Sequence, residues 1–271
     1  MKMDDFLKFI WLKPAEELRC GATSLKNHAE RKISYPFELI VNLRADLESD
    51  LRVLGAGVLG LVHPSAVLYA PENMLIEAGA EVEAGAVLDA RGGPIYIGAG
   101  TIVRPLSYLR GPLSIGPGCR IGGEVTHSIF HGYTNKAHYG FIGHSYIGEW
   151  ANLGAGTTNS NLKNTYGTVK MTLNGKEFDT GEQFLGCLIG DHAKLGIGTL
   201  IPTGAVIGLG ANIFGGGLTP KVVPAFSWGA KEKVELEKFI ATGKNAMSRR
   251  GKKMSAGEET LLKKLFNLSS G

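Results

Sequence analysis

An aliphatic residue returns at every sixth position through the middle of the chain, and glycine or another small residue often follows it. The clearest run extends from Ile97 to Ile121, and later runs cover residues 147–154 and 189–213. A period of six is neither the 3.6 of an α-helix nor the 2 of a plain strand. It is typical of the hexapeptide repeat of a left-handed parallel β-helix. We therefore predict an all-β fold built on that coil, with helical segments at both ends.

Three hexads form one triangular coil of about 18 residues, with a short strand on each side. The aliphatic residue of each hexad points inward, and residue i+18 stacks above residue i. We therefore expect Ile97 beneath Ile115 and Ile189 beneath Ile207. Each buried aliphatic side chain contributes about 1.5–3 kcal/mol. The 39 glycines fit the corners, where small residues and positive φ are favoured.

The six-residue period fails twice, over residues 125–139 and again over 159–187. We interpret the second failure as a loop excursion from the coil. The β-helix is expected over residues 59–230. An N-terminal helical linker segment should precede it at 1–58, with helical spacing over 37–54, and a C-terminal helical cap or tail should follow at 231–271. A helix there would cover the open end of the last coil.

Composition narrows the class of protein. No apolar stretch is long enough to span a membrane, and the first residues, MKMDDFLKFIWLKPAEE, lack a signal-peptide cleavage pattern. The cysteines Cys20, Cys119 and Cys187 form no CxxC motif, so we expect reduced, inert packing residues. These features predict a cytoplasmic location and no membrane partner.

Positive charge is concentrated at the C-terminal end. Residues 231–264 contain ten Lys or Arg and five Asp or Glu, whereas the whole chain has a net charge of only +4. Nucleic acid could attract such a stretch. No recognition motif or interleaved aromatic accompanies the charge, so we expect no nucleic-acid partner. A solvated helix face, or a patch facing coenzyme A phosphates, is the favoured interpretation.

A β-helix this narrow has no internal cavity, so its sites should lie outside, in grooves between subunits of a homotrimer. The segment 122–164 around the first failure of the period contains four histidines, and histidine is the natural general base near neutral pH. They are His127, His131, His138 and His144.

Residues from about 94 to 230 resemble the C-terminal acyltransferase half of the bifunctional glucosamine-1-phosphate acetyltransferase/N-acetylglucosamine-1-phosphate uridyltransferase family. The segments that carry the resemblance are RGP at 110–112, GGEV at 122–125, NKAH at 135–138, IGEWANLGAGTTNSNLKN at 147–164 and FSWG at 226–229. The resemblance implies a hexapeptide-repeat acyltransferase that takes acetyl-CoA as co-substrate, with no metal.

Site residues follow from that resemblance. His138 matches the family's catalytic base, Asn161 an asparagine near the reacting centre, and Glu124 a glutamate near the base. The implied substrate-binding set is Arg110 for the sugar phosphate, Asn152 for the sugar, Phe141 in place of a phosphate-contacting tyrosine, and Lys136. The implied cofactor-binding set is Gly154, Ala155, Gly215, and Ile197 in place of a serine.

The implied function is acetyl-CoA-dependent N-acetylation of an amino-sugar-1-phosphate or a nucleotide amino sugar. The chain shows no glycine-rich nucleotidyltransferase loop before the repeat, so we expect it to lack that activity, and a separate nucleotidyltransferase is a possible partner. One alternative is a non-catalytic β-helix that binds a sugar phosphate or trimerises such a partner. Another is a γ-type carbonic anhydrase with zinc held by histidines, although the histidine spacing does not fit that family.

Overall fold

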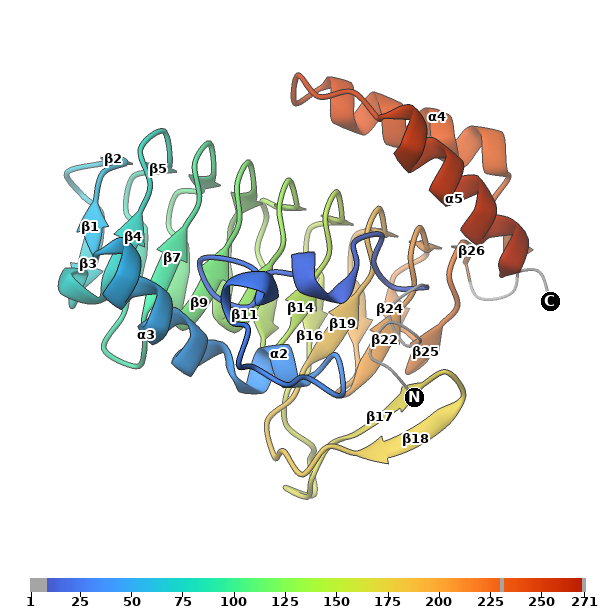
Figure 1. Cartoon of the computed structure of the whole chain (residues 1–271), viewed down its shortest axis with the longest axis horizontal. Helices are drawn as coiled ribbons and strands as arrows, with labels where there is room; N and C mark the ends of the chain where they lie inside the picture. The colour runs from blue at the N-terminus through green and yellow to red at the C-terminus, as the bar shows by residue number, and fades with distance from the viewer. Residues whose placement is uncertain (1–8, 230–231, 270–271) are drawn as a thin grey trace.

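The computed structural model describes residues 9–229 and 232–269, and it shows a parallel β-helix lined lengthwise by helices (Figure 1). Ile97 pairs with Ile115 and Ile189 with Ile207, as the period predicts. The inward aliphatic residues of successive coils form one continuous buried core. The predicted fold class is therefore confirmed.

The coil has three faces, which we name by their surroundings. The covered face contains β1 (Gly57–Val58), β4 (Met74–Ile76), β7 (Ile95–Ile97), β14 (Tyr146–Ile147), β19 (Cys187–Ile189), β22 (Ala205–Ile207), β25 (Val222–Val223) and the second halves of β9 (Tyr108–Ile115) and β11 (Glu124–Phe130). The polar face contains β2 (Leu61–Val62), β5 (Glu81–Val82), β8 (Ile102–Val103), β10 (Arg120–Ile121), β12 (Asn135–Lys136), β15 (Asn152–Leu153), β20 (Lys194–Leu195), β23 (Asn212–Ile213) and β26 (Ser227–Trp228), which pairs with β27 (Glu232–Lys233). The open face contains β3 (Val67–Tyr69), β6 (Val87–Asp89), β13 (Phe141–Gly143), β16 (Thr158–Asn159), β21 (Thr199–Ile201), β24 (Gly217–Leu218) and the first halves of β9 and β11.

The coil does not stop where the period fails at 125–139. Phe130 stacks on Ile115 and Lys136 on Ile121, so the coil continues with fewer residues per turn. A register shift between Thr126 and Ser128 absorbs the difference. The period therefore fails without a break in the coil, because an aromatic residue and a lysine occupy positions where the pattern required an aliphatic residue.

The second irregular region leaves the coil after β16 and returns at β19. It contains an antiparallel hairpin, β17 (Lys170–Leu173) and β18 (Lys176–Asp179), which projects from the lower edge in Figure 1. Met171 and Leu173 are buried, and the Phe178 ring lies 4.9 Å from that of Tyr35 in the N-terminal segment. The hairpin therefore packs against the molecule's own N-terminal segment.

The N-terminal segment lies as a strap across the covered face, and only its second part is helical, as the spacing over 37–54 predicts. Residues 9–36 contain only the 3-10 turns η1 (Ala15–Glu17) and η2 (Leu25–Asn27), and helices α2 (Glu38–Val41) and α3 (Leu43–Leu54) follow. A third 3-10 turn, η3 (Pro71–Asn73), lies within the coil. Trp11, Leu18 and Leu43 are buried in a cluster with Tyr146 of the covered face. The start of the chain, residues 1–8, lies outside the described residues.

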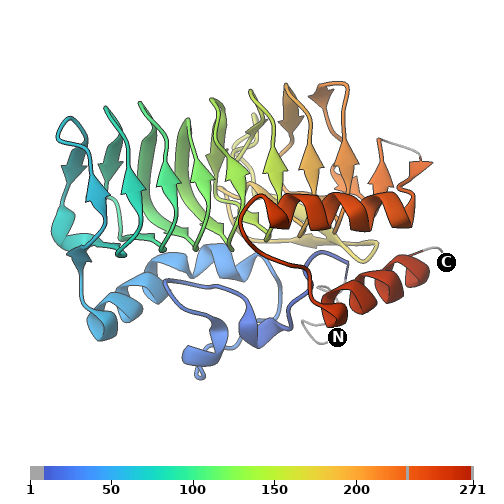
Figure 2. The same cartoon turned by 90° about the horizontal axis from the view of Figure 1, so that it is seen from above.

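The C-terminal helices α4 (Leu236–Ser248) and α5 (Ala256–Leu268) lie alongside the coil. Figure 2 shows α4 parallel to the long axis of the coil. Phe239 of α4 packs on Phe226 in a late coil, and Arg250 donates to the carbonyl of Gly118, several coils earlier. The helix therefore runs along the corner between the covered and polar faces, which corrects the expectation that it covers the end of the last coil.

Candidate active site

His138 stands at the corner where the polar face meets the open face. The strand β12 ends at Lys136, the chain turns through Ala137 and His138, and β13 begins at Phe141. His138 is exposed. Its imidazole is therefore accessible to a molecule bound at this corner.

The residues expected to contact acetyl-CoA lie along the same corner. Asn152 pairs with Asn135 below and Lys194 above, and this register continued into the turn places Ala155 above His138 and Ile197 above Ala155. The Gly198 amide donates to the Ala155 carbonyl at 2.8 Å, as that stacking requires. The next coil adds Gly215.

Glycine at position 154 allows these corners to stack closely. A Cβ there would lie 2.7 Å from the backbone nitrogen of Ile197, so a larger residue would separate the two coils. Ile197 itself is 74% exposed. Small and aliphatic residues, namely Ala155, Ile197 and Gly215, therefore follow one another above His138 in successive coils.

The open face carries three of the other predicted groups, Arg110, Glu124 and Phe141. Glu124 pairs with Phe141, and Arg110 lies between Asp89 and Thr126. Arg110 and Glu124 are both exposed. An exposed guanidinium can hold a phosphate through two parallel hydrogen bonds. Arg110, a possible ligand for phosphate, is thus separated from the His138 corner by the width of the open face.

Asn161 lies at the opposite corner of the open face, where that face meets the covered face. Its amide Nδ2 is 2.9 Å from Nδ1 of His144, whose ring stacks on His127 at 4.4 Å. Burial, with a smaller contribution from His127, lowers the pKa of His144 to about 3. The ring is therefore neutral, and its Nδ1 can accept the amide hydrogen.

His138 and Asn161 are therefore separated in a single chain by the width of the open face. The Phe141 ring extends into this space. A Cβ placed on Gly143 would lie 2.4 Å from Phe141 Cζ and 2.9 Å from Asn161 Nδ2. An interval of 17 residues, which is one coil, separates His127 from His144 and His144 from Asn161. This spacing is visible in the sequence and predicts that the three residues stack.

Two members of the predicted substrate set lie away from the open face. Asn152 is on the polar face, where its Oδ1 accepts from Asn135 Nδ2 at 2.9 Å. Lys136 is completely buried, and its Nζ donates to the carbonyls of Gly122, at 3.0 Å, and His138. Its assignment as a substrate ligand is therefore wrong, because its ammonium group lies inside the coil.

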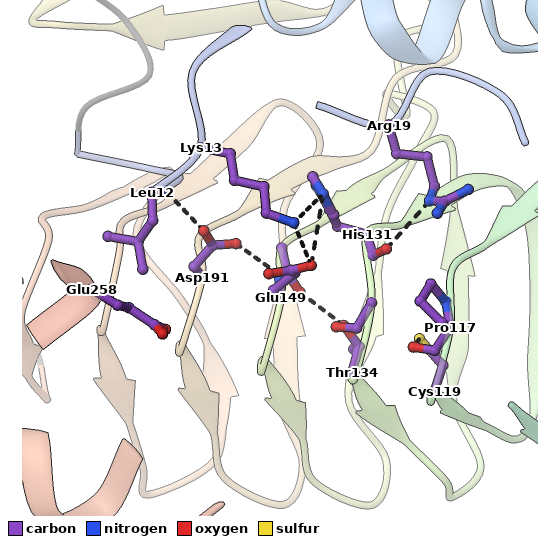
Figure 3. A network of polar contacts seen from close by, with 12 residues as sticks. Leu12, Lys13, Arg19, Pro117, Cys119, His131, Thr134, Glu149, Asp191 and Glu258 are labelled. Carbon is purple, nitrogen blue, oxygen red and sulfur yellow. Dashed lines mark hydrogen bonds and ion pairs between the residues drawn. The ribbon is translucent and has the colours of Figure 1, made fainter. Parts of the chain in front are cut away.

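His131 takes part in a structural network instead of the candidate site (Figure 3). Its Nδ1 is 2.9 Å from the Tyr146 hydroxyl, and burial lowers its pKa well below the ordinary value. Lys13 of the strap donates to Glu149 at 2.8 Å. Asp191 accepts hydrogen bonds from the backbone amides of Leu12, at 2.7 Å, and Glu149, at 2.6 Å. The network fastens the strap to three successive coils.

Asp191→Ala is expected to lower the free energy of unfolding by about 2–3 kcal/mol, because each abandoned buried amide costs about 1–3 kcal/mol. Urea unfolding measures the loss, and trypsin cleavage after Arg19 should accelerate as the strap loosens. Glu16→Ala is the matched control, since it removes an exposed carboxylate from the same strap. Equal midpoints for the two variants would contradict the anchoring role of Asp191.

The other reactive side chains form no second candidate active site or metal site within residues 9–229 and 232–269. The three cysteines are buried and unpaired, and burial raises the pKa of Cys119 and of Cys187 to about 12. No group of three or more His, Cys, Asp or Glu in this part of the chain could hold a metal. None of the helices within these residues could span a bilayer.

Comparison with known proteins identifies relatives of the coil. The chain is 35% identical over 154 residues to a bifunctional sugar-1-phosphate nucleotidylyltransferase/acetyltransferase from Sulfurisphaera tokodaii, which covers 56% of this chain and 37% of that protein. It is 30% identical over 156 residues to the bifunctional protein GlmU of a Picosynechococcus species, covering 56% and 29% respectively. The resemblance inferred from the sequence is thereby confirmed. The match spans only about a third of the length of these relatives.

Other comparisons add little. No protein-family profile matches the chain. A solved structure described as an acetyltransferase from Bacillus cereus is 15% identical, covering 78% of this chain and 99% of that one, with a TM-score of 0.40. The acetyltransferase domain of PglB from Neisseria gonorrhoeae, in complex with acetyl coenzyme A, is 15% identical, covering 67% and 74%, with a TM-score of 0.20. TM-scores this low support no conclusion about this chain.

Proposed function

We propose that this chain is an acetyl-CoA-dependent N-acetyltransferase that acts on an amino-sugar-1-phosphate or a nucleotide amino sugar. The observation that carries the proposal is the corner formed by His138, Ala155 and Ile197. It stacks Ala155 and the exposed Ile197 above an exposed imidazole, beside a face that carries Arg110. The acetyltransferase named in the relatives' descriptions supports the same chemistry.

In this proposal His138 takes a proton from the substrate amine as its nitrogen attacks the thioester carbonyl carbon. A new C–N bond forms, and the carbonyl electron pair moves to oxygen. When the tetrahedral intermediate collapses, the C–S bond breaks, and the imidazolium returns its proton to the departing sulfur. The products are an amide and free coenzyme A. The backbone amide of Ala155 can stabilise the oxyanion, since its neighbours Gly154 and Gly156 already donate to other carbonyls, and Arg110 holds the phosphate.

The proposed active assembly is a homotrimer, since one chain separates His138 from Asn161. Packing of open faces would bring Asn161 of one chain toward His138 of another. The open face carries exposed apolar side chains toward both ends of one row in strand register, with the exposed Glu124 between them, and such side chains are typical of an interaction surface. The row includes Val67 at 42% exposed, Tyr108 at 39%, Leu200 at 45% and Leu218 at 72%. Sedimentation equilibrium should return about three times 28.8 kDa, whereas a monomer at assay concentration would contradict this assembly.

Thiol release from acetyl-CoA tests the reaction directly. The purified chain should release coenzyme A in the presence of glucosamine-1-phosphate or a nucleotide amino sugar, and mass spectrometry should find the N-acetylated product. An acceptor without phosphate should react poorly, because Arg110 then has no partner. Absence of turnover with every phosphorylated amino sugar would refute the proposal.

A second candidate is a non-catalytic β-helix that binds a sugar phosphate or trimerises a separate nucleotidyltransferase. Phe141 and Ile197 favour it, because neither supplies the hydroxyl group that the resembling family has there. Calorimetry would then detect sugar-phosphate binding without thiol release. Arg110→Ala should abolish that binding under either candidate, so thiol release is the measurement that separates them.

A further inference from the structure

Lys136 occupies a position that the rest of its column reserves for aliphatic side chains. The strand register aligns it with Ile121 below and Leu153 above. The other members of the column are Val62, Val82, Val103, Leu195 and Ile213. A buried ammonium group costs free energy unless its hydrogen bonds are satisfied, and aliphatic residues fill this space elsewhere.

Both hydrogen bonds of Lys136 end at the corner that carries His138. Its Nζ donates to the Gly122 carbonyl of the preceding coil at 3.0 Å, and to the carbonyl of His138 itself. No backbone amide among the described residues is hydrogen-bonded to the His138 carbonyl. Strand residues are held in place by backbone hydrogen bonds to neighbouring strands, but His138 lies in a turn. The ammonium group of Lys136 holds the His138 backbone instead.

The ammonium group keeps this restraint at neutral pH. Burial lowers the pKa of Lys136 to about 8, so the side chain is still mostly protonated at pH 7. After loss of the proton, two N–H groups remain for the two carbonyls. The contacts therefore hold His138 against the preceding coil across the neutral range.

We infer that Lys136 is a positioning residue, which acts from inside the coil to fix the corner and thereby the orientation of the His138 imidazole. The expected effect on kcat rests on the proposed acetyl transfer, whereas the effect on the order of the corner does not. A bound substrate amine needs the base within about 3 Å and correctly directed. A corner that moves by an ångström loses much of that advantage.

Lys136→Met is the informative variant, because methionine fills the same space without the two donors. We expect kcat to fall at least tenfold while the KM for acetyl-CoA changes less than twofold, and Lys136→Arg to restore part of kcat. Val103→Ala is the control, since it disturbs the same inward column two coils away. Wild-type kcat in Lys136→Met, or an equal loss of kcat in Val103→Ala, would overturn the inference.

A second measurement does not depend on the reaction. The Gly156 amide donates to the carbonyl of Tyr139, the residue after His138, at 3.0 Å. Its hydrogen exchange, compared with that of Gly98 on the covered face, should accelerate about tenfold in Lys136→Met and remain unchanged in Val103→Ala. An unchanged ratio would overturn the positioning role. If the wild-type chain catalyses no acetyl transfer, the proposed function is refuted but the role of Lys136 is not. The ratio of hydrogen exchange at Gly156 to that at Gly98 still tests that role.

Discussion

His138→Ala is expected to reduce kcat/KM for acetyl transfer by about 10²- to 10⁴-fold, the range supplied by a positioned general base. The side chain is exposed and lies at a corner, so its removal leaves the inward column intact. Thiol release at saturating acetyl-CoA measures the loss, and thermal unfolding should give the wild-type midpoint.

The matched control for this variant is His63→Ala. His63 is also exposed, and its Nδ1 lies within hydrogen-bond distance of Ser65, far from the His138 corner in the first coils of the chain. Its removal should leave kcat/KM unchanged. If His138→Ala retains wild-type turnover while the wild-type enzyme is active, another group is the base, and the assignment of the site to this corner is wrong.

Residues whose position depends on period alone could be predicted from the sequence. The spacing of Ile97 and Ile115 determines both the coil and the face to which each strand belongs, because every inward residue obeys the same geometry. The corner of the candidate site did not follow from the period, because His138 lies where the period fails and the excursion at 159–187 separates Ala155 from Ile197. Only the strand register through Asn152 and Lys194 places Ala155 and Ile197 above His138.

Residues that break the period could not be placed in the same way. Lys136 looked like a surface group because charged side chains are rarely buried, and only the stacking on Ile121 shows that it is inside. The strap was also hidden, since its order depends on distant contacts such as that of the Trp11 indole with the Ile189 carbonyl, at 3.0 Å. Local sequence patterns carry no information about a partner 178 residues away.

His144 is expected to make the folded state less stable as the pH drops below 6.5, by an amount that unfolding experiments can measure. The folded state holds its imidazole neutral with a pKa of about 3, whereas an unfolded chain protonates it near 6.5. Between these values the unfolded state binds more protons, so acid favours unfolding. The contribution is present in full above pH 6.5 and is lost progressively toward pH 3, by up to about 1.4 kcal/mol per pH unit.

His144→Gln isolates this contribution, because glutamine does not titrate and its carbonyl can still accept from Asn161. Urea unfolding of both proteins at pH 7, 6 and 5 should show that the wild type loses more stability than the variant, by up to about 2 kcal/mol over this interval. Burial also lowers the pKa of His127 and raises that of Asp191. Both residues are present in each protein, so their contributions to the free energy of unfolding cancel in the difference between the two. Parallel curves would show that His144 is not held neutral. Because the folded ring stays neutral over this interval, its Nδ1 keeps the contact with the Asn161 amide, and only the unfolded chain takes up the proton.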